Sequence, residues 1–206
     1  MLLKVISASA LMALGINAFC QKIEFHGWEF WPGFNHGYKA EIDNKYTYKG
    51  MNSVRIQRDE KNNYDICSLL QTFSDRNLAG KRVRMTGYIR SPNYGDSAFM
   101  WVRVADYNKR MSTDYGNTAV RIRTSRNWMK HEIVFDVGDN CEIFFGFMFR
   151  GNERAWFDNV SFETVSNSTL KTTISLNTPL TDADLEKYPD FEVPRKVPVN
   201  LDFEDE

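Results

Sequence analysis

Short stretches of alternating apolar and polar residues, separated by turn-forming residues, constrain this chain more than any other feature. Alternation with a period of two is typical of half-buried β-strands, because successive side chains of a strand point to opposite faces. Such stretches lie at residues 53–57, 83–90, 100–104, 132–137 and 155–162. The more uniformly apolar runs at residues 69–73 and 143–149 predict strands that are buried on both faces.

Turn chemistry separates these runs. The turn-forming segments are Lys49-Gly50, Ala79-Gly80-Lys81, Asn93-Tyr94-Gly95-Asp96 and Gly138-Asp139-Asn140. Glycine, asparagine and aspartate favour the backbone conformations that tight turns require. No stretch shows convincing helical periodicity. Many short strands with regularly spaced turns predict an all-β sandwich or barrel.

The first residues have the pattern of an export signal. Lys4 supplies a positive charge, residues 5–16 form an apolar run, and Ala18 and Cys20 are small residues before a cut ahead of Gln21. We therefore expect residues 1–20 to be a signal peptide and the protein to be secreted or periplasmic. A structural helix and a lipid anchor on Cys20 are the alternatives, and the bulky Phe19 argues against the anchor.

Charge and cysteine content limit the partners. The formal net charge is −1, so the chain offers no general electrostatic attraction for nucleic acid. The N-terminal apolar run is shorter than the roughly 20 residues of a spanning helix, and we expect no spanning membrane segment. Cys67 and Cys141 can form a disulfide in an oxidising compartment, but a single pair has no diagnostic spacing.

Residues 166–206 differ in composition from the rest of the chain. Residues 166–178 are rich in Ser, Thr and Asn, and four prolines follow, at positions 179, 189, 194 and 198. This composition predicts an extended surface tail over residues 166–206, after a sandwich domain over residues 21–165. Residues 199–203 are strand-like again, and we expect them to form an edge strand on this domain or on a neighbour.

A set of segments in a characteristic order suggests a family. They are residues 69–73, 80–90 and 100–104, Trp128 with residues 132–137, Phe145-Gly146, and Gly151 with residues 156–163. Together they resemble the galactose-binding-like, carbohydrate-binding-module jelly roll, an accessory domain of bacterial secreted hydrolases and some regulators. The resemblance covers residues 27–163 and implies a two-sheet antiparallel β-sandwich.

The resemblance also implies a structural calcium ion. In that superfamily an Asn-x-x-Phe-Glu pattern followed by Trp marks the first strand. Here it is split between residues 23–25, which precede Trp28, and residues 200–204. The terminal copy is either an edge strand or the start of a second module. Asp158, with Glu24 or Glu204, would supply the hard oxygen ligands that calcium prefers; alternatively, Asp158 accepts backbone N–H bonds in a turn.

A sheet face is the candidate ligand site. Strand alternation turns Tyr88 and Arg90 outward, and likewise Trp101 and Arg103. The predicted ligand-binding residues are Trp101, Arg103, Tyr88, Arg90, Gln71 and Arg150. Aromatic rings stack on the apolar face of a pyranose, and planar polar groups bind its hydroxyls. Alternatively, loops cover this face and Trp101 belongs to a second small core.

These observations favour a non-catalytic secreted module that binds a carbohydrate, and the alternative is an assembly protein that joins a partner protein through an edge strand or the tail. The aromatic residues Trp28, Phe30, Trp31 and Phe34 either line a loop-end site or close one end of the sandwich. Glu41-Ile42-Asp43 resembles the paired carboxylates of jelly-roll glycosidases, but Tyr46 stands where a third acidic residue is needed. We therefore expect no enzymatic activity.

Overall fold

The computed structural model describes residues 23–32, 37–59, 66–93, 95–116, 125–182, 184 and 196–205. The predicted signal peptide lies outside these residues, and its export function stays a prediction. The described elements, in chain order, are β1 (Ile23–Phe25), β2 (Trp28–Trp31), β3 (Tyr38–Asp43), β4 (Ser53–Arg58), β5 (Cys67–Phe73), the 3₁₀-helix η1 (Arg76–Leu78), β6 (Arg82–Ser91), β7 (Ser97–Asp106), β8 (Met111–Gly116), β9 (Ser125–Asp136), β10 (Cys141–Arg150), β11 (Arg154–Val165) and β12 (Ile174–Pro179).

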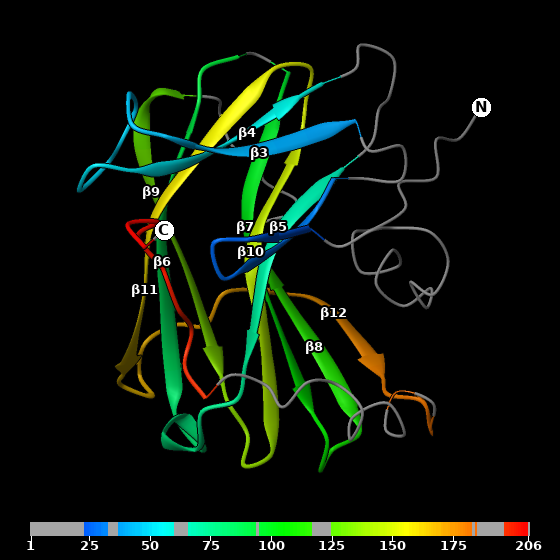
Figure 1. The fold of residues 1–206 in the computed structure, drawn as a ribbon. Helices are drawn as coiled ribbons and strands as arrows, with labels where there is room; N and C mark the ends of the chain where they lie inside the picture. The colour runs from blue at the N-terminus through cyan, green and yellow to red at the C-terminus, as the bar shows by residue number, and fades with distance from the viewer. Residues whose placement is uncertain are drawn as a thin grey trace.

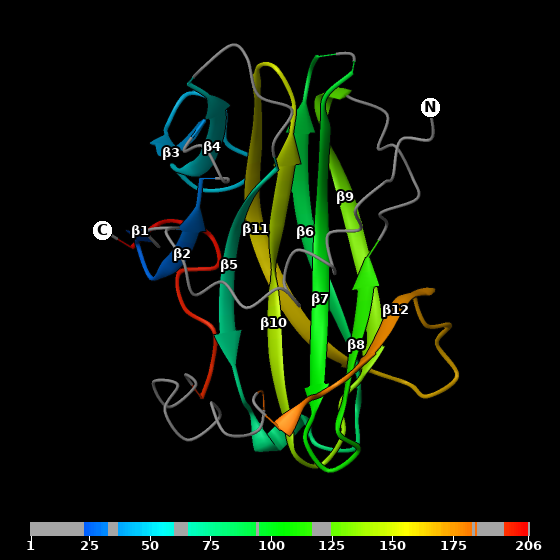
Figure 2. The same ribbon diagram turned by 90° about the vertical axis from the view of Figure 1, so that its right-hand side faces the viewer.

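The strands form two antiparallel sheets. One has seven strands in the order β1-β2-β5-β10-β7-β8-β12, and the other has five in the order β3-β4-β11-β6-β9. The sheets lie face to face as two layers (Figure 1, Figure 2). The predicted all-β, two-sheet antiparallel sandwich is therefore confirmed.

Alternation along the strands supplies the core between the layers. In β10 the side chains of Ile143, Phe145, Phe147 and Phe149 are fully buried, and Phe157 of β11 packs on Phe147 with ring centroids 4.5 Å apart. Residues of β6 and β7 alternate in the same way, as the sequence pattern predicted. Burial of these large apolar side chains is the main stabilising contribution to the fold.

The described residues of the C-terminal segment lie against the sandwich. Strand β12 pairs with β8 at the edge of the seven-stranded sheet. Residues 199–203 do not form the expected edge strand. Asn200 and Phe203 have positive φ angles of 45° and 60°, which a strand does not allow, and they shape a turn that buries Phe203. The domain boundary at residue 165 stays a prediction, and the described residues after it pack on the sandwich.

No disulfide joins the two cysteines of the described region. Cys67 and Cys141 are buried and make no disulfide. Burial raises the pKa of the Cys141 thiol to about 11, so the thiol stays protonated at neutral pH. In the part of the chain that the structure describes, no helix has the length and apolar character needed to cross a membrane.

Candidate functional site

The six residues predicted to form one ligand face lie on two different sheets. Tyr88 and Arg90 are on β6 of the five-stranded sheet, whereas Trp101 and Arg103 are on β7 of the seven-stranded sheet. Gln71 on β5 and Arg150 on β10 also belong to the seven-stranded sheet. The expectation that they converge in one groove is wrong, because alternation fixes the face of a strand but not the sheet it joins.

The predicted residues of the seven-stranded sheet already have intramolecular roles. Trp101 is 6% exposed, so it is not an open stacking surface. Arg103 makes a two-point ion pair with Asp114, with Nε–Oδ1 and Nη2–Oδ2 distances of 2.6 and 3.0 Å. The expected use of these two side chains in an open groove is therefore not supported by their positions.

Gln71 binds the C-terminal segment. Its Nε2 donates to the carbonyl of Val199 at 2.6 Å, and the amide of Val199 donates to its Oε1 at 3.0 Å. The Gln71 side chain thus makes the two backbone hydrogen bonds with Val199 that a neighbouring strand would make. This position corrects the prediction that Gln71 belongs to a ligand site. Arg150 is exposed at the end of β10, and ligand binding there stays a prediction.

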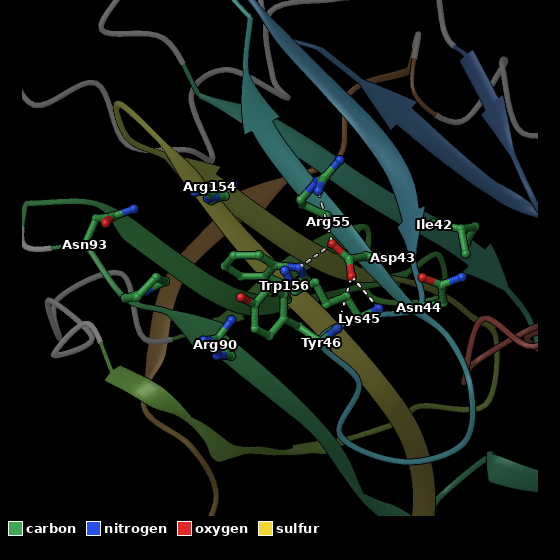
Figure 3. Close-up of a pocket in the computed structure, with 11 residues that line it drawn as sticks. Ile42, Asp43, Asn44, Lys45, Tyr46, Arg55, Arg90, Asn93, Arg154 and Trp156 are labelled. Atoms are coloured by element: carbon green, nitrogen blue, oxygen red, sulfur yellow. Dashed lines mark hydrogen bonds and ion pairs between the residues drawn. The ribbon is translucent and has the colours of Figure 1, made fainter.

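A pocket of about 460 Å³ lies on the outer face of the five-stranded sheet, where β3, β4, β6 and β11 meet the loop after β3 (Figure 3). It is lined by Ile42, Asp43, Asn44, Lys45, Tyr46, Arg55, Arg90, Pro92, Asn93, Arg154 and Trp156. Register explains why three of these side chains meet: Trp156 of β11 lies directly between Arg55 of β4 and Arg90 of β6. Arg90 is thus the predicted ligand residue that does line a pocket.

Two aromatic rings and a guanidinium form the wall of this pocket. Tyr46 packs edge-on against Trp156 with ring centroids 5.1 Å apart. The Arg90 guanidinium lies over both rings, 4.2 Å from the centroid of Tyr46 and 4.7 Å from that of Trp156. Trp156 is buried, whereas Tyr46 is 37% exposed. Tyr46 therefore offers the accessible ring surface, and Trp156 and Arg90 hold it in place.

Asp43 organises the pocket. Its Oδ1 accepts hydrogen bonds from the amides of Lys45 and Tyr46 at 2.8 and 3.0 Å, which fixes the loop that carries Tyr46. Its Oδ2 accepts from Trp156 Nε1 at 3.0 Å and from Arg55 Nη1 at 3.1 Å. Burial by itself would raise the pKa of Asp43, but these hydrogen bonds and the Arg55 charge together lower it.

Glu41, the other half of the predicted carboxylate pair, is also bound to Arg55. Both carboxylates therefore share one guanidinium. Asp43 uses both oxygens for hydrogen bonds and keeps a lowered pKa, so it is held as an anion. A glycosidase acid needs a raised pKa and access to the leaving oxygen; this arrangement supplies neither at Asp43.

The rest of the loop is fixed by two more carboxylates. Asp158 Oδ2 accepts from the amides of Tyr48 and Lys49 at 2.7 and 3.1 Å. Glu204, from the C-terminal segment, accepts from the amides of Met51 and Asn52 at 2.7 and 2.9 Å. Residues 43–52 are thus held at three successive points, and the pocket wall is preformed.

Tyr88 lies beside the pocket and not in it. Its ring stacks on Tyr48 with centroids 3.5 Å apart and an interplanar angle of 15°. Trp128 contacts Tyr48 edge-on at 6.1 Å. The outward orientation predicted for Tyr88 agrees with this position. Its stacking face is covered by Tyr48, which is itself 43% exposed.

The predicted calcium ligands are partly brought together. Asp158 is fully buried, and its Oδ1 has no hydrogen-bond partner among the described residues. Burial is the main cause that raises the pKa of Asp158 to about 6, and the charge of Glu204 adds to the rise. The side chain of Glu24 lies outside the described part of the chain. Within that part, no group of three or more His, Cys, Asp or Glu side chains is placed to hold a metal ion.

Sequence reasoning missed Tyr46, Trp156 and Asn93 as members of one pocket. In the sequence analysis, Trp156 contributes only to the family resemblance. Tyr46 contributes only as the residue that stands where a glycosidase needs a third acidic residue. The usable signal was Asp43 followed by two turn residues, because an aspartate at this position typically accepts the next backbone amides and fixes a loop.

Comparisons with known proteins identify a distant relative by sequence and many solved structures with a similar fold. No protein-family model matches the chain. The chain is 26% identical over 183 residues to an uncharacterised HTH-type transcriptional regulator, YbfP, of Bacillus subtilis. The match covers 87% of this chain but spans only 57% of that regulator's length.

Several solved structures similar to this chain are carbohydrate-binding modules. TmCBM61 in complex with β-1,4-galactotriose is 16% identical and has a TM-score of 0.49, covering 69% of this chain and 91% of that one. The CBM22-1 xylan-binding domain of Paenibacillus barcinonensis Xyn10C is 12% identical with a TM-score of 0.47, covering 69% and 88%. The Stig cyclase Fisc of a Fischerella species is 10% identical with a TM-score of 0.47, covering 74% and 91%.

Proposed function

We propose that this chain is a non-catalytic carbohydrate-binding module and that it holds its saccharide in the pocket around Tyr46. The observation that carries the proposal is the preformed wall of Tyr46, Trp156 and Arg90 beside the polar groups of Asn44 and Asn93. An exposed ring that is fixed from behind can stack on a pyranose with little loss of conformational entropy. Amide and guanidinium groups can then bind the sugar hydroxyls.

The location of the pocket differs from the ligand face expected from the sequence. The proposed site lies on the five-stranded sheet, and Trp101 of the other sheet has no part in it. The engaged state of Asp43 and Glu41 supports a binding role over hydrolysis. The alternative of an assembly protein that uses its C-terminal arm is less well supported, because residues 199–204 dock on their own domain.

We also propose that the protein is exported, on the pattern of residues 1–20. We further propose that Asp158 binds a structural calcium ion through Oδ1, which has no hydrogen-bond partner among the described residues. Glu204 supplies a second carboxylate, whose charge acts on Asp158. Calcium also needs several other oxygen ligands, which backbone carbonyls and water commonly provide. Such an ion would stabilise the loop and would not take part in recognition.

The function is tested with a glycan panel probed with the protein and two variants. Tyr46→Ala removes the exposed ring and is expected to abolish measurable binding of any glycan that the unmodified protein retains. Met51→Ala is the matched control, because Met51 lies in the same loop, is 74% exposed and does not line the pocket. Equal binding by Tyr46→Ala and the unmodified protein would show that the saccharide lies elsewhere.

A further inference from the structure

The pocket carries more positive charge than its own carboxylates can balance. Its lining contains the cations Lys45, Arg55, Arg90 and Arg154 and a single acidic residue, Asp43. The whole chain, in contrast, has a formal net charge of −1. The surplus is therefore a local property of this site and not of the protein surface in general.

Among the described residues, Arg55 is the one cation of these four that has an ion pair. Arg55 donates to Asp43 and to Glu41. No ion pair of Lys45, Arg90 or Arg154 occurs among the described residues, although many other Lys and Arg side chains of this domain are paired. Three cationic side chains from three different elements thus line one pocket (Figure 3), and the part of the chain that the structure describes gives them no anionic partner.

The aromatic pair brings these three cations together. The Arg90 guanidinium lies over both rings, Arg154 lies 5.7 Å from the centroid of Trp156, and the Lys45 ammonium lies 5.4 Å from the centroid of Tyr46. Mutual repulsion of like charges at one site costs free energy, and cation–π contacts act in the opposite direction. A bound anion would remove this repulsion.

Arg90 also has a donor without an acceptor. Its Nε donates to the carbonyl of Arg126 at 2.8 Å, which fixes the plane of the guanidinium. Its Nη1 is buried and has no hydrogen-bond partner within the described residues. A buried donor that stays unpaired is unfavourable, and a guanidinium is most strongly satisfied by an anionic oxygen.

We propose that the pocket selects a saccharide with an acidic unit, whose uronate carboxylate is bound by Arg90, Arg154 and Lys45 while its ring stacks on Tyr46. The inference rests on the proposed carbohydrate-binding function and adds the class of sugar. A neutral sugar would use the ring and the amide groups but would leave the three cations uncompensated. A planar carboxylate matches the planar fork of an arginine and supplies the missing negative charge.

The test compares uronic-acid oligosaccharides with their methyl esters, because each pair has the same rings and linkages and differs in charge. Galacturonate, glucuronate and mannuronate oligomers are titrated into the full chain by calorimetry at low and high salt. We expect at least one acid to bind roughly tenfold or more tightly than its ester, with an advantage that shrinks in high salt. Equal affinity of acid and ester, or tighter binding of neutral glycans, would overturn the acidic selectivity and leave the carbohydrate-binding function intact.

Two further arms complete the design. Arg154→Gln is expected to reduce the affinity for the acid by a larger factor than the affinity for its ester. Arg76→Gln is the control, because Arg76 is an exposed arginine of η1 outside the pocket. A matched pair of sulfated and desulfated glycans tests the nature of the anion: preference for the sulfate over every uronate would refute the carboxylate. Failure of all acidic and neutral glycans to bind would refute both this inference and the proposed function.

Discussion

The indole of Trp28 stacks on the ring of Phe203, with ring centroids 5.2 Å apart and an interplanar angle of 26°. Both side chains are buried, and Trp28 Nε1 donates to the carbonyl of Asn200 at 2.9 Å. The C-terminal turn therefore completes the core next to β1 and β2 (Figure 2). It also carries Glu204, which holds the loop of the candidate pocket. Core packing at one end of the chain and the pocket wall are thus physically linked.

Phe203→Ala should destabilise the whole domain, because it removes a ring that is 1% exposed and leaves a cavity beside Trp28. We expect a loss of about 3–5 kcal/mol in the free energy of unfolding, measured by urea denaturation with tryptophan fluorescence. Val197→Ala is the control, since Val197 is 56% exposed in the same segment. A loss below about 1 kcal/mol for Phe203→Ala would mean that the turn does not pack on the core.

Gly50→Ala should weaken both stability and saccharide binding. Gly50 has a φ of +72°, and an added Cβ would lie 2.3 Å from Glu204 Oε1, the atom that accepts from Met51 and Asn52. Gly80→Ala is a matched control, with a φ of +70° and no atom within 4 Å of the added Cβ. Both changes should cost about 1–2 kcal/mol of unfolding free energy through backbone strain, but only Gly50→Ala should also reduce binding. Equal binding by the two variants would show that Glu204 does not position the pocket loop.

The sequence allowed the strands to be predicted but not their partners. The alternating runs at residues 83–90 and 100–104 coincide with β6 and β7, because a half-buried strand needs one apolar face. Strands β8 and β12 were not predicted. β12 is the edge strand of the seven-stranded sheet and β8 lies next to it, and Met111–Gly116 contains few apolar residues. The pairing of β12 with β8 joins segments distant in sequence, which local patterns do not encode.

The candidate site was less predictable than the fold. The outward orientation of Arg90 followed from alternation, but its neighbour Trp156 became visible only once β6 and β11 were paired in register. Gln71 was misplaced for a similar reason, because its partner Val199 is far away in the chain. A binding site made from several strands depends on sheet order, and sheet order was the information that the sequence lacked.

Glu142 should make stability depend on pH. Burial raises the pKa of Glu142 above its ordinary value, although the hydroxyl of Tyr107 donates to it at 2.6 Å and acts in the opposite direction. The folded state therefore binds the Glu142 proton more tightly than the unfolded state. Its contribution to stability is greatest at pH values below the unfolded pKa and is lost as pH rises through the folded pKa.

Glu142→Gln should remove this dependence, because glutamine keeps the acceptor for Tyr107 without the charge. We expect the variant to be more stable than the unmodified protein at pH 7 and equal or less stable at pH 4, measured by urea denaturation at both values. Glu163→Gln is the control, since Glu163 is exposed on β11. The same stability difference at both pH values would contradict the raised pKa.

Calcium should raise the melting temperature of the protein, if Asp158 is a ligand as proposed. A cation bound to Oδ1 of Asp158 would compensate the negative charge of this buried carboxylate, on which the charge of Glu204 also acts. Because an ion that binds only the folded state stabilises it by mass action, we expect a rise of several degrees in excess calcium relative to EGTA. Differential scanning fluorimetry measures this shift directly.

Asp158→Asn should melt at the same temperature in calcium and in EGTA, whereas Asp139→Asn, at an exposed position, should keep the full response to calcium. If calcium does not change the melting temperature of the unmodified protein, Asp158 is not a calcium ligand. Its role is then to accept hydrogen bonds from the amides of Tyr48 and Lys49.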